Sequence, residues 1–250
     1  MPRSRLIVIA VVAILAVGVG GFIVYDQVLR GDSAAALALP TSSPSPATKN
    51  PAASSDAGAS AAPASSFDGA AAGTWNVAAD SIAGYRVREQ LANLPAESDA
   101  VGRTDQITGS ITLEGSGSTT TLTAATLTVD TTSITSDKTM RDNRMRHEGL
   151  QTDAYPTATF TLTAPVEVPA AALAGTASDV TLTGDLTLHG ATKTVSIPAK
   201  AQLVNDTISV AGSISFPLSD YSITAPNIGG FIVSIADTGT LEFLVNFSQG

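Results

Sequence analysis

Apolar and polar residues alternate along most of the chain from Thr74 to Phe247. The clearest runs are ITGSITL at residues 107–113, FTLTAPVEV at 160–168 and LEFLVNF at 241–247. A strand with this pattern has one apolar face, and the Gly, Asn and Asp residues between the runs are typical of tight turns. The pattern predicts an all-β fold, an antiparallel meander of about eight or nine strands, which suits closure into a narrow barrel. A two-sheet sandwich is the alternative architecture.

One segment interrupts the alternation: residues 136–156, with the sequence SDKTMRDNRMRHEGLQTDAYP. It starts with capping residues and reaches Gly149 after about three helical turns, which predicts a short helical insertion between two strands. On a helix, Met140, Arg144 and His147 lie close to one face, and Met145 lies on a neighbouring face. We therefore expect the insertion to lie across one mouth of the barrel.

The N-terminal region carries a candidate membrane segment. Residues 6–25, LIVIAVVAILAVGVGGFIVY, contain no charge, and their length matches the ~20 residues that a helix needs to cross a bilayer. Arg3 and Arg5 precede the segment, so the positive-inside rule places the rest of the chain on the extracytoplasmic side of the cell membrane. A cleaved signal peptide is the alternative, because residues 36–38, Ala-Leu-Ala, form a small-x-small site; the domain would then be secreted.

The composition changes sharply between this segment and the alternating runs. Residues 31–73 are rich in Ala, Ser, Pro, Thr and Gly and contain almost no large apolar side chain. Such a segment cannot bury a core, and its Pro and small polar residues keep the chain extended. We therefore expect a transmembrane helix (or signal peptide) within residues 1–30, a disordered linker at 31–73 and a β-barrel domain at 74–250.

Charge and composition exclude several classes of function. A formal net charge of -9 and a pI near 4.5 disfavour nucleic acid as a partner. The absence of Cys excludes disulfides, thiolate zinc sites and a thiol nucleophile. His147 and His189 are the only histidines, and two ligands do not make a metal site. Because there is also no Gly-x-Ser-x-Gly elbow, we expect no catalytic residue, no metal and no cofactor, and we predict that the chain is not an enzyme.

Three stretches resemble the YceI-like family of lipocalin-like, polyisoprenoid-binding proteins. They are TSITSDKTMRDNRMRHEGLQTDAYPTATF, VTLTGDLTLHGATKTVSIPA and FPLSDYSITAPNIGGFIVSIADTGTLEFLVNF, within residues 132–247. The resemblance implies an eight-stranded antiparallel barrel with helical additions, an apolar interior that holds a long lipid tail, export from the cytoplasm and a possible homodimer. The sequence departs from the family in the more polar residues 84–102 and in the turn at 226–230, which leaves the head group open.

Large apolar residues on the inward faces and in the connections are candidates for the cavity lining or its gate. They are Tyr85, Leu91, Leu94, Met140, Met145, Leu150, Phe160, Phe216, Ile228 and Phe231. Arg141 and Arg144 are candidates for contact with a phosphate or carboxylate head group. The structural alternative is that Arg141 or Asp142 ties the helical insertion to the barrel through a salt bridge or a capped turn.

The expected function is the binding, storage or transport of an extended isoprenoid-like lipid at the outer face of the cell membrane. The same inward side chains would equally fill a dry core, because an eight-stranded barrel lies near the boundary between filled and hollow. The alternative is therefore an envelope stress or protein-interaction scaffold with a filled barrel and no ligand.

Overall fold

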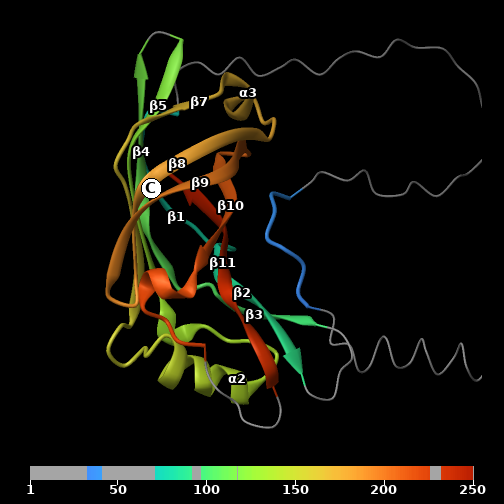
Figure 1. The fold of residues 1–250 in the computed structure, drawn as a ribbon. Coiled ribbons are helices and arrows are strands. Elements are labelled where there is room, and N and C mark those ends of the chain that lie inside the picture. The colour runs from blue at the N-terminus through green and yellow to red at the C-terminus, as the bar shows by residue number, and fades with distance from the viewer. Residues whose placement is uncertain (1–32, 41–70, 92–96, 117, 226–231, 250) are drawn as a thin grey trace, which may run out of the picture.

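The computed structural model describes residues 33–40, 71–91, 97–116, 118–225 and 232–249 (Figure 1). Residues 6–25, which the sequence predicts to cross the membrane, lie outside these ranges. Within the ranges, none of the helices combines the length and the apolar character that a membrane crossing requires.

Strands dominate the described fold. They are β1 (Gly73–Val77), β2 (Ile82–Leu91), β3 (Ser98–Thr104), β4 (Ile107–Ser116), β5 (Thr119–Asp130), β6 (Thr157–Leu162), β7 (Val166–Val168), β8 (Ser178–Leu188), β9 (Ala191–Val204), β10 (Thr207–Pro217) and β11 (Ile232–Ser248). The helical elements are η1 (Thr131–Ser133), α2 (Thr139–Arg144), the π-helix η2 (Met145–Gly149), α3 (Ala170–Leu173) and η3 (Leu218–Tyr221). The alternating runs of the sequence fall on these strands, with residues 160–168 divided between β6 and β7.

Antiparallel pairing closes the strands into a barrel. The order is β1-β4-β5-β6-β8-β9-β10-β11, and β1 also pairs with β11. β2 and β3 prolong β1 and β4 towards one end, because β2 pairs with β11 and with β3, and only Asp105 and Gln106 separate β3 from β4. The eight-stranded antiparallel barrel is thus confirmed, and the sandwich is excluded.

The two ends of the barrel have different interiors. At one end, a cluster of buried side chains that includes Trp75, Leu122, Val245 and Phe247 fills the space between the strands. The Trp75 indole is satisfied there, because its Nε1 donates a hydrogen bond to the Ala71 carbonyl at 2.9 Å. The second cluster surrounds the other half of the barrel, with Leu150, Phe160, Leu186, Leu188 and Phe216 among its members. Only the first end is packed as a solid core.

The helical insertion covers the end of the barrel that the second cluster surrounds (Figure 1). Its first helix is shorter than expected, and the N-cap residue Lys138 makes no side-chain capping bond. Instead, the Asp142 carboxylate accepts hydrogen bonds from the Ser136 amide at 2.8 Å and the Ser136 hydroxyl at 2.6 Å. The helix then widens, because the Leu150 amide donates to the Met145 carbonyl at 2.7 Å, and it ends at Gly149 as the sequence predicts.

Part of the segment that the sequence predicts to be a disordered linker lies against the barrel. Residues 33–40 run beside β2 and β3 (Figure 1), and the Leu39 side chain is buried. At the other end of the predicted linker, Ala71 is buried under Trp75, and β1 begins at Gly73. Residues 41–70 lie outside the described residues. The composition of residues 31–73 does not predict these contacts, because they are made by backbone carbonyls and by a single leucine side chain.

Candidate functional site

A cavity of about 490 Å³ occupies the half of the barrel that lies under the helical insertion. Its wall is made mainly of aliphatic and aromatic side chains that the strands direct inward. They include Val87, Ile107, Leu127, Val129, Ile134, Phe160, Leu182, Leu186, Leu188, Ile197, Ile214, Phe216, Leu241 and Phe243. The parity that gives each strand one apolar face therefore builds one continuous apolar lining.

Small residues keep this part of the barrel open. Ala83, Ala100 and Ala158 are wall residues from three different strands. Glycines allow aromatic rings to lie against the wall: a Cβ placed on Gly184 would come within 2.6 Å of the Phe160 ring, and a Cβ placed on Gly102 would come still closer to the Tyr85 ring. The interior of the described barrel is thus hollow on this side, rather than filled as the scaffold alternative requires.

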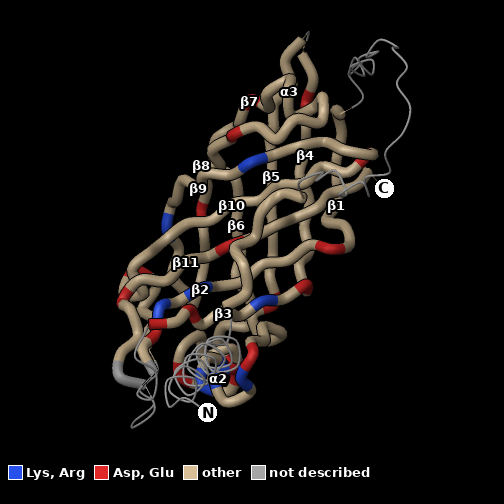
Figure 2. Tube along the Cα trace, turned by 90° about the vertical axis from the view of Figure 1, so that its right-hand side faces the viewer, with Lys and Arg blue, Asp and Glu red and all other residues tan. Residues whose placement is uncertain are grey.

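Residues of α2 and η2 line one end of the cavity, which we call its mouth. Met140, Arg144 and Met145 contribute to its wall, and 66% of the Met140 surface is exposed to solvent. Charged residues of both signs gather at this end, around α2 and the neighbouring ends of β2 and β3 (Figure 2). The site thus combines an apolar interior with a polar mouth, as a molecule with one polar end would require.

Arg141 connects the helical insertion to the barrel at the mouth. Its guanidinium forms ion pairs with Glu89 of β2, whose side chain is buried, and with Asp137. Burial opposes the charged form of Arg141, but the hydrogen bond and the attraction from Glu89, supported by Asp137, raise its pKa above the ordinary value. This is the salt bridge that the structural alternative expected, and Asp142 supplies the capped turn.

Tyr85 lies in the cavity wall close to the same charges. Burial raises the pKa of its phenol well above the ordinary value; Asp142, Glu89 and Asp137 raise it further, whereas Arg141 lowers it. The hydroxyl therefore stays protonated at neutral pH. It can donate a hydrogen bond to an oxygen atom of a guest molecule, but it is not available as a phenolate nucleophile.

Eight of the residues that the sequence predicts for the site contribute to the cavity wall. They are Tyr85, Met140, Met145, Leu150, Phe160 and Phe216 among the lining candidates and Arg141 and Arg144 among the head-group candidates. Leu94, Ile228 and Phe231 lie outside the described residues. Leu91 ends β2, and the position of its side chain is not described. The role of each residue in ligand binding stays a prediction.

Sequence reasoning missed Glu89 and most of the aliphatic wall. The alternation along β2 could have predicted Glu89 and part of this wall. Tyr85, Val87 and Glu89 are two residues apart from one another, so they face the same side of the strand, and all three contribute to the wall. A carboxylate that follows two inward-facing residues at this spacing indicates a buried partner, which Arg141 provides.

The two histidines have separate surroundings. His189 lies in the turn between β8 and β9 with a positive φ of 50°, its Nδ1 is 2.9 Å from the Tyr221 carbonyl, and its ring packs against Tyr155. His147 is exposed, with its Nδ1 3.9 Å from an oxygen of Asp153. In the described part of the chain, no three His, Cys, Asp or Glu residues are grouped so that they could hold a metal ion.

Comparisons with known proteins agree with this geometry. The family model for the YceI-like domain matches residues 75–247. The structure of a polyisoprenoid binding domain from Saccharophagus degradans, implicated in plant cell wall breakdown, is similar at 23% identity with a TM-score of 0.55, and the match covers 71% of this chain and 98% of that one. BcnA from Burkholderia cenocepacia is similar at 21% identity with a TM-score of 0.50, over 66% of this chain and 95% of that one. At these identities the structural likeness shows the fold alone. A comparison with curated proteins gives no match.

Proposed function

Because the chain belongs to the YceI-like family, we propose that its barrel binds an extended apolar lipid of the isoprenoid type. The observation that carries the proposal is the cavity of about 490 Å³ with an apolar wall and a polar mouth. A volume of this size falls within the range of ~300–1,000 Å³ that small-molecule sites occupy. The polyisoprenoid binding domain from Saccharophagus degradans, which has a similar fold, supports the same class of ligand.

Burial of the hydrocarbon tail supplies the binding energy. Each methylene group that moves from water into the cavity contributes about 0.8 kcal/mol, so affinity increases with the buried length of the tail. Polar groups cluster at the mouth, and the opposite end of the barrel is closed by the packed cluster around Trp75 and Phe247. The tail therefore enters first, and the head group stays near α2.

Arg144 is the better of the two head-group candidates. Its side chain is 42% exposed and pairs with Glu148, which is equally exposed, so a guest can replace this partner at little cost. Arg141 is held by Glu89 and Asp137, and a head group would have to compete with a buried ion pair. We assign Arg141 to the attachment of the helical insertion and Arg144 to contact with the head group.

We further propose that the protein stores or carries its ligand at the outer face of the cell membrane, held there by residues 6–25, without a chemical reaction. The wall is mainly apolar and its charged residues lie at the mouth, while burial keeps the Tyr85 phenol in the wall protonated at neutral pH because it raises the pKa of that group. Such a wall suits retention of a lipid rather than its turnover.

The test is native mass spectrometry, with organic extraction, of the full chain recovered from the membrane fraction of a host that makes isoprenoids. A bound species with the mass of a prenyl lipid is the expected result. A protein that arrives empty and also refuses added prenyl lipids would contradict the proposal and favour the interaction scaffold. The same spectrum gives the oligomeric state, for which the homodimer implied by the resemblance stays a prediction.

A further inference from the structure

The outer face of the barrel near its mouth carries a buried carboxylate. Glu242 lies between Leu241 and Phe243 of β11 and borders the cavity with them, but its carboxylate pairs with Arg86 and Arg103, which do not line the cavity. Alternation therefore directs this side chain to the outer face, yet it is only 3% exposed. Arg103 binds it through Nη2 at 2.8 Å and Nε at 3.2 Å, and Arg86 approaches its other oxygen at 3.5 Å. A carboxylate on the outside of a barrel is buried only if something covers it.

The two arginines over Glu242 also bind residues 33–40, which we call the strap. Arg86 Nη2 donates a hydrogen bond to the Ala34 carbonyl at 2.6 Å, and Arg103 Nη2 donates to the Ala35 carbonyl. Each guanidinium has five N–H donors, so the strap carbonyls add acceptors to the Glu242 carboxylate and, for Arg86, to the Asp99 carboxylate at 3.2 Å. The strap thus adds two backbone acceptors to the ion-pair cluster around the buried Glu242.

Two further contacts fix the register of the strap. The Ser33 hydroxyl donates to the Asp99 carbonyl at 2.9 Å and accepts from the Asp99 amide at 3.2 Å, so the strap begins at the exposed edge of β3. At its other end the Leu39 side chain is buried at 9% exposure, whereas Ala34, Ala35 and Ala36 are exposed. The barrel therefore binds the strap through two backbone carbonyls, one hydroxyl and one leucine side chain.

The strap begins at the mouth of the cavity. Asp99 pairs with Arg88 in the β2–β3 ladder, one position from the pair of Ser98 with Glu89. Glu89 is the residue that holds Arg141 of α2, so Ser33 lies level with the elements that form the mouth. Only eight residue steps separate Tyr25, the last residue of the apolar segment, from Ser33. Even a fully extended chain spans no more than ~29 Å over that length.

We propose that the β2–β3–β11 surface around Arg86, Glu242 and Arg103 is a docking site for the protein's own strap, which holds the barrel with its mouth next to the membrane. A free linker over residues 31–73 would instead let the domain move up to ~150 Å from the bilayer, in any orientation. The membrane part of this inference rests on the proposed function, because it takes residues 6–25 as the anchor. When the strap is bound, only a short piece of chain separates the membrane segment from the barrel. The mouth then lies close to the bilayer, and lipid can pass directly from one to the other.

The strap also bears on the processing of the chain. The small-x-small site at residues 36–38 lies within it, and cleavage after Ala38 would remove both carbonyls that Arg86 and Arg103 bind. A chain whose fold uses these residues has to keep them. The intact mass of the protein from its native membrane should therefore include Ser33 and the residues before it, and a mass that begins at Leu39 would overturn the proposal.

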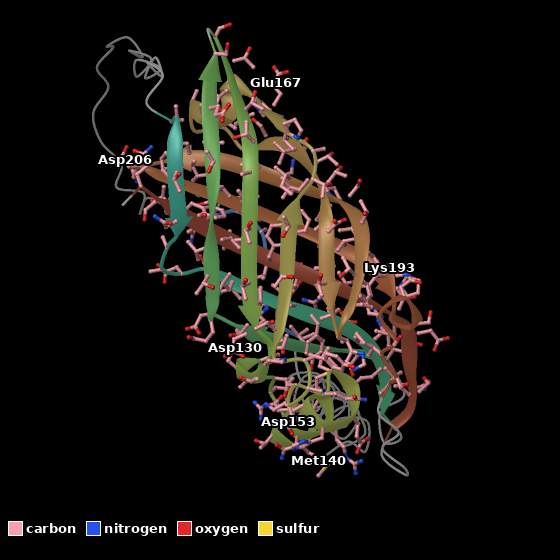
Figure 3. All side chains as sticks on the ribbon, turned by 90° about the vertical axis from the view of Figure 1, so that its left-hand side faces the viewer. Asp130, Met140, Asp153, Glu167, Lys193 and Asp206 are labelled. Atoms are coloured by element: carbon pink, nitrogen blue, oxygen red, sulfur yellow. The ribbon has the colours of Figure 1, made fainter. Side chains whose placement is uncertain are left out.

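The second test uses energy transfer from a dye on the full-length chain to labelled lipids in a nanodisc. The chain has no Cys, so Asp153→Cys and Glu167→Cys each give one labelling site, and these residues lie at opposite ends of the molecule (Figure 3). Both side chains are exposed. We expect stronger transfer from position 153, at the mouth end, than from position 167.

Variants on both sides of the contact show whether the strap causes this difference. Arg103→Gln removes the donor to Ala35, and Leu39→Asp disrupts the strap without changing the barrel. We expect both to abolish the difference between the two dyes, whereas Lys200→Gln, which alters a 56% exposed lysine that pairs with Asp179 of β8, should preserve it. Equal transfer from both positions in the unchanged protein would overturn the proposal. An empty barrel with unequal transfer would contradict lipid binding alone, and a loaded barrel with equal transfer would contradict the strap alone.

Discussion

Substitution of Ala158 by Phe tests directly whether the barrel has room for a guest. Ala158 lies on β6 with the same parity as Phe160, and it contributes to the wall of the cavity. A phenyl ring at this position would extend into the open space. It would displace roughly four methylene groups of a bound tail, which amounts to about 3 kcal/mol, or about 150-fold in affinity.

The same substitution should not harm the empty protein. In a packed core, an added ring forces neighbours out of their rotamers and costs about 1–3 kcal/mol, whereas in a cavity it gains contacts. Ala125, which is 7% exposed in the packed cluster at the other end of the barrel, offers the matched control. We expect Ala125→Phe to lower the free energy of unfolding by about 1–3 kcal/mol and Ala158→Phe to leave it unchanged or to raise it by about 1 kcal/mol.

Urea unfolding of the lipid-free proteins measures the free energy of unfolding, and titration with a fluorescent prenyl lipid measures the affinity for the tail. The reasoning would be refuted by an Ala158→Phe protein that is as destabilised as Ala125→Phe, because the interior near β6 would then be packed. It would be refuted equally by unchanged lipid affinity in a stable Ala158→Phe protein, because the guest would then bind elsewhere.

Three further substitutions probe the mouth and the wall. Glu89→Gln leaves Arg141 without its buried counter-charge, so we expect a loss of about 1–3 kcal/mol in the free energy of unfolding and faster release of a bound lipid in stopped-flow dilution. Gly184→Ala places a Cβ 2.6 Å from the Phe160 ring, so we expect destabilisation of about 1–3 kcal/mol in urea unfolding. Burial raises the pKa of Tyr85, so the unfolded chain loses this proton first and stability should fall as the pH rises above about 10; Tyr85→Phe should remove that part of the fall.

Two of these expectations have a control substitution within the chain. Glu148→Gln alters an ion pair that is 42% exposed on both sides, and it should change the free energy of unfolding by less than about 0.5 kcal/mol. Gly115→Ala adds a Cβ whose nearest neighbour is 3.9 Å away, so it should be tolerated. An equal effect of Glu89→Gln and Glu148→Gln, or of the two glycine substitutions, would contradict the proposed geometry. So would identical alkaline unfolding of Tyr85→Phe and the unchanged protein.

The sequence predicts the barrel well because alternation is a local signal. Each run, such as residues 107–113 or 241–247, carries its own apolar face and its own turns, and closure follows when all the faces turn inward. β3 was harder to find, because SDAVGRT has no alternation; Ala100, Val101 and Gly102 are all buried there. Gly102 is buried because the Tyr85 ring lies against it. This contact between β3 and β2 depends on the fold and cannot be predicted from either strand alone.

The cavity is a less local property than the barrel. Whether an inward alanine is a gap or a packed contact depends on what faces it across the barrel, and Ala125 and Ala158 look alike in the sequence. In the fold, Ala125 belongs to the cluster that Trp75 and Phe247 fill, whereas Ala158 faces open space. The pairing of Arg141 with Glu89 is equally non-local, because 52 positions separate the two residues. The sequence left Arg141 open between contact with a head group and a salt bridge to the barrel, and the structure shows the salt bridge, to Glu89.

Side-chain size differs along the barrel axis: large rings fill one end, and the other end is open. The two ends of the barrel therefore cannot have the same role. The large rings of Trp75 and Phe247 fill one end of the described barrel, so we expect a tail to enter from the end where Met140 is exposed and Arg144 has a partner it can exchange. The strap begins at that same end, at Asp99, through contacts that do not touch the cavity wall. We therefore expect orientation at the membrane and affinity for the lipid to depend largely on different residues. Loss of the strap should slow the loading of lipid from a bilayer while the affinity for lipid in solution stays the same.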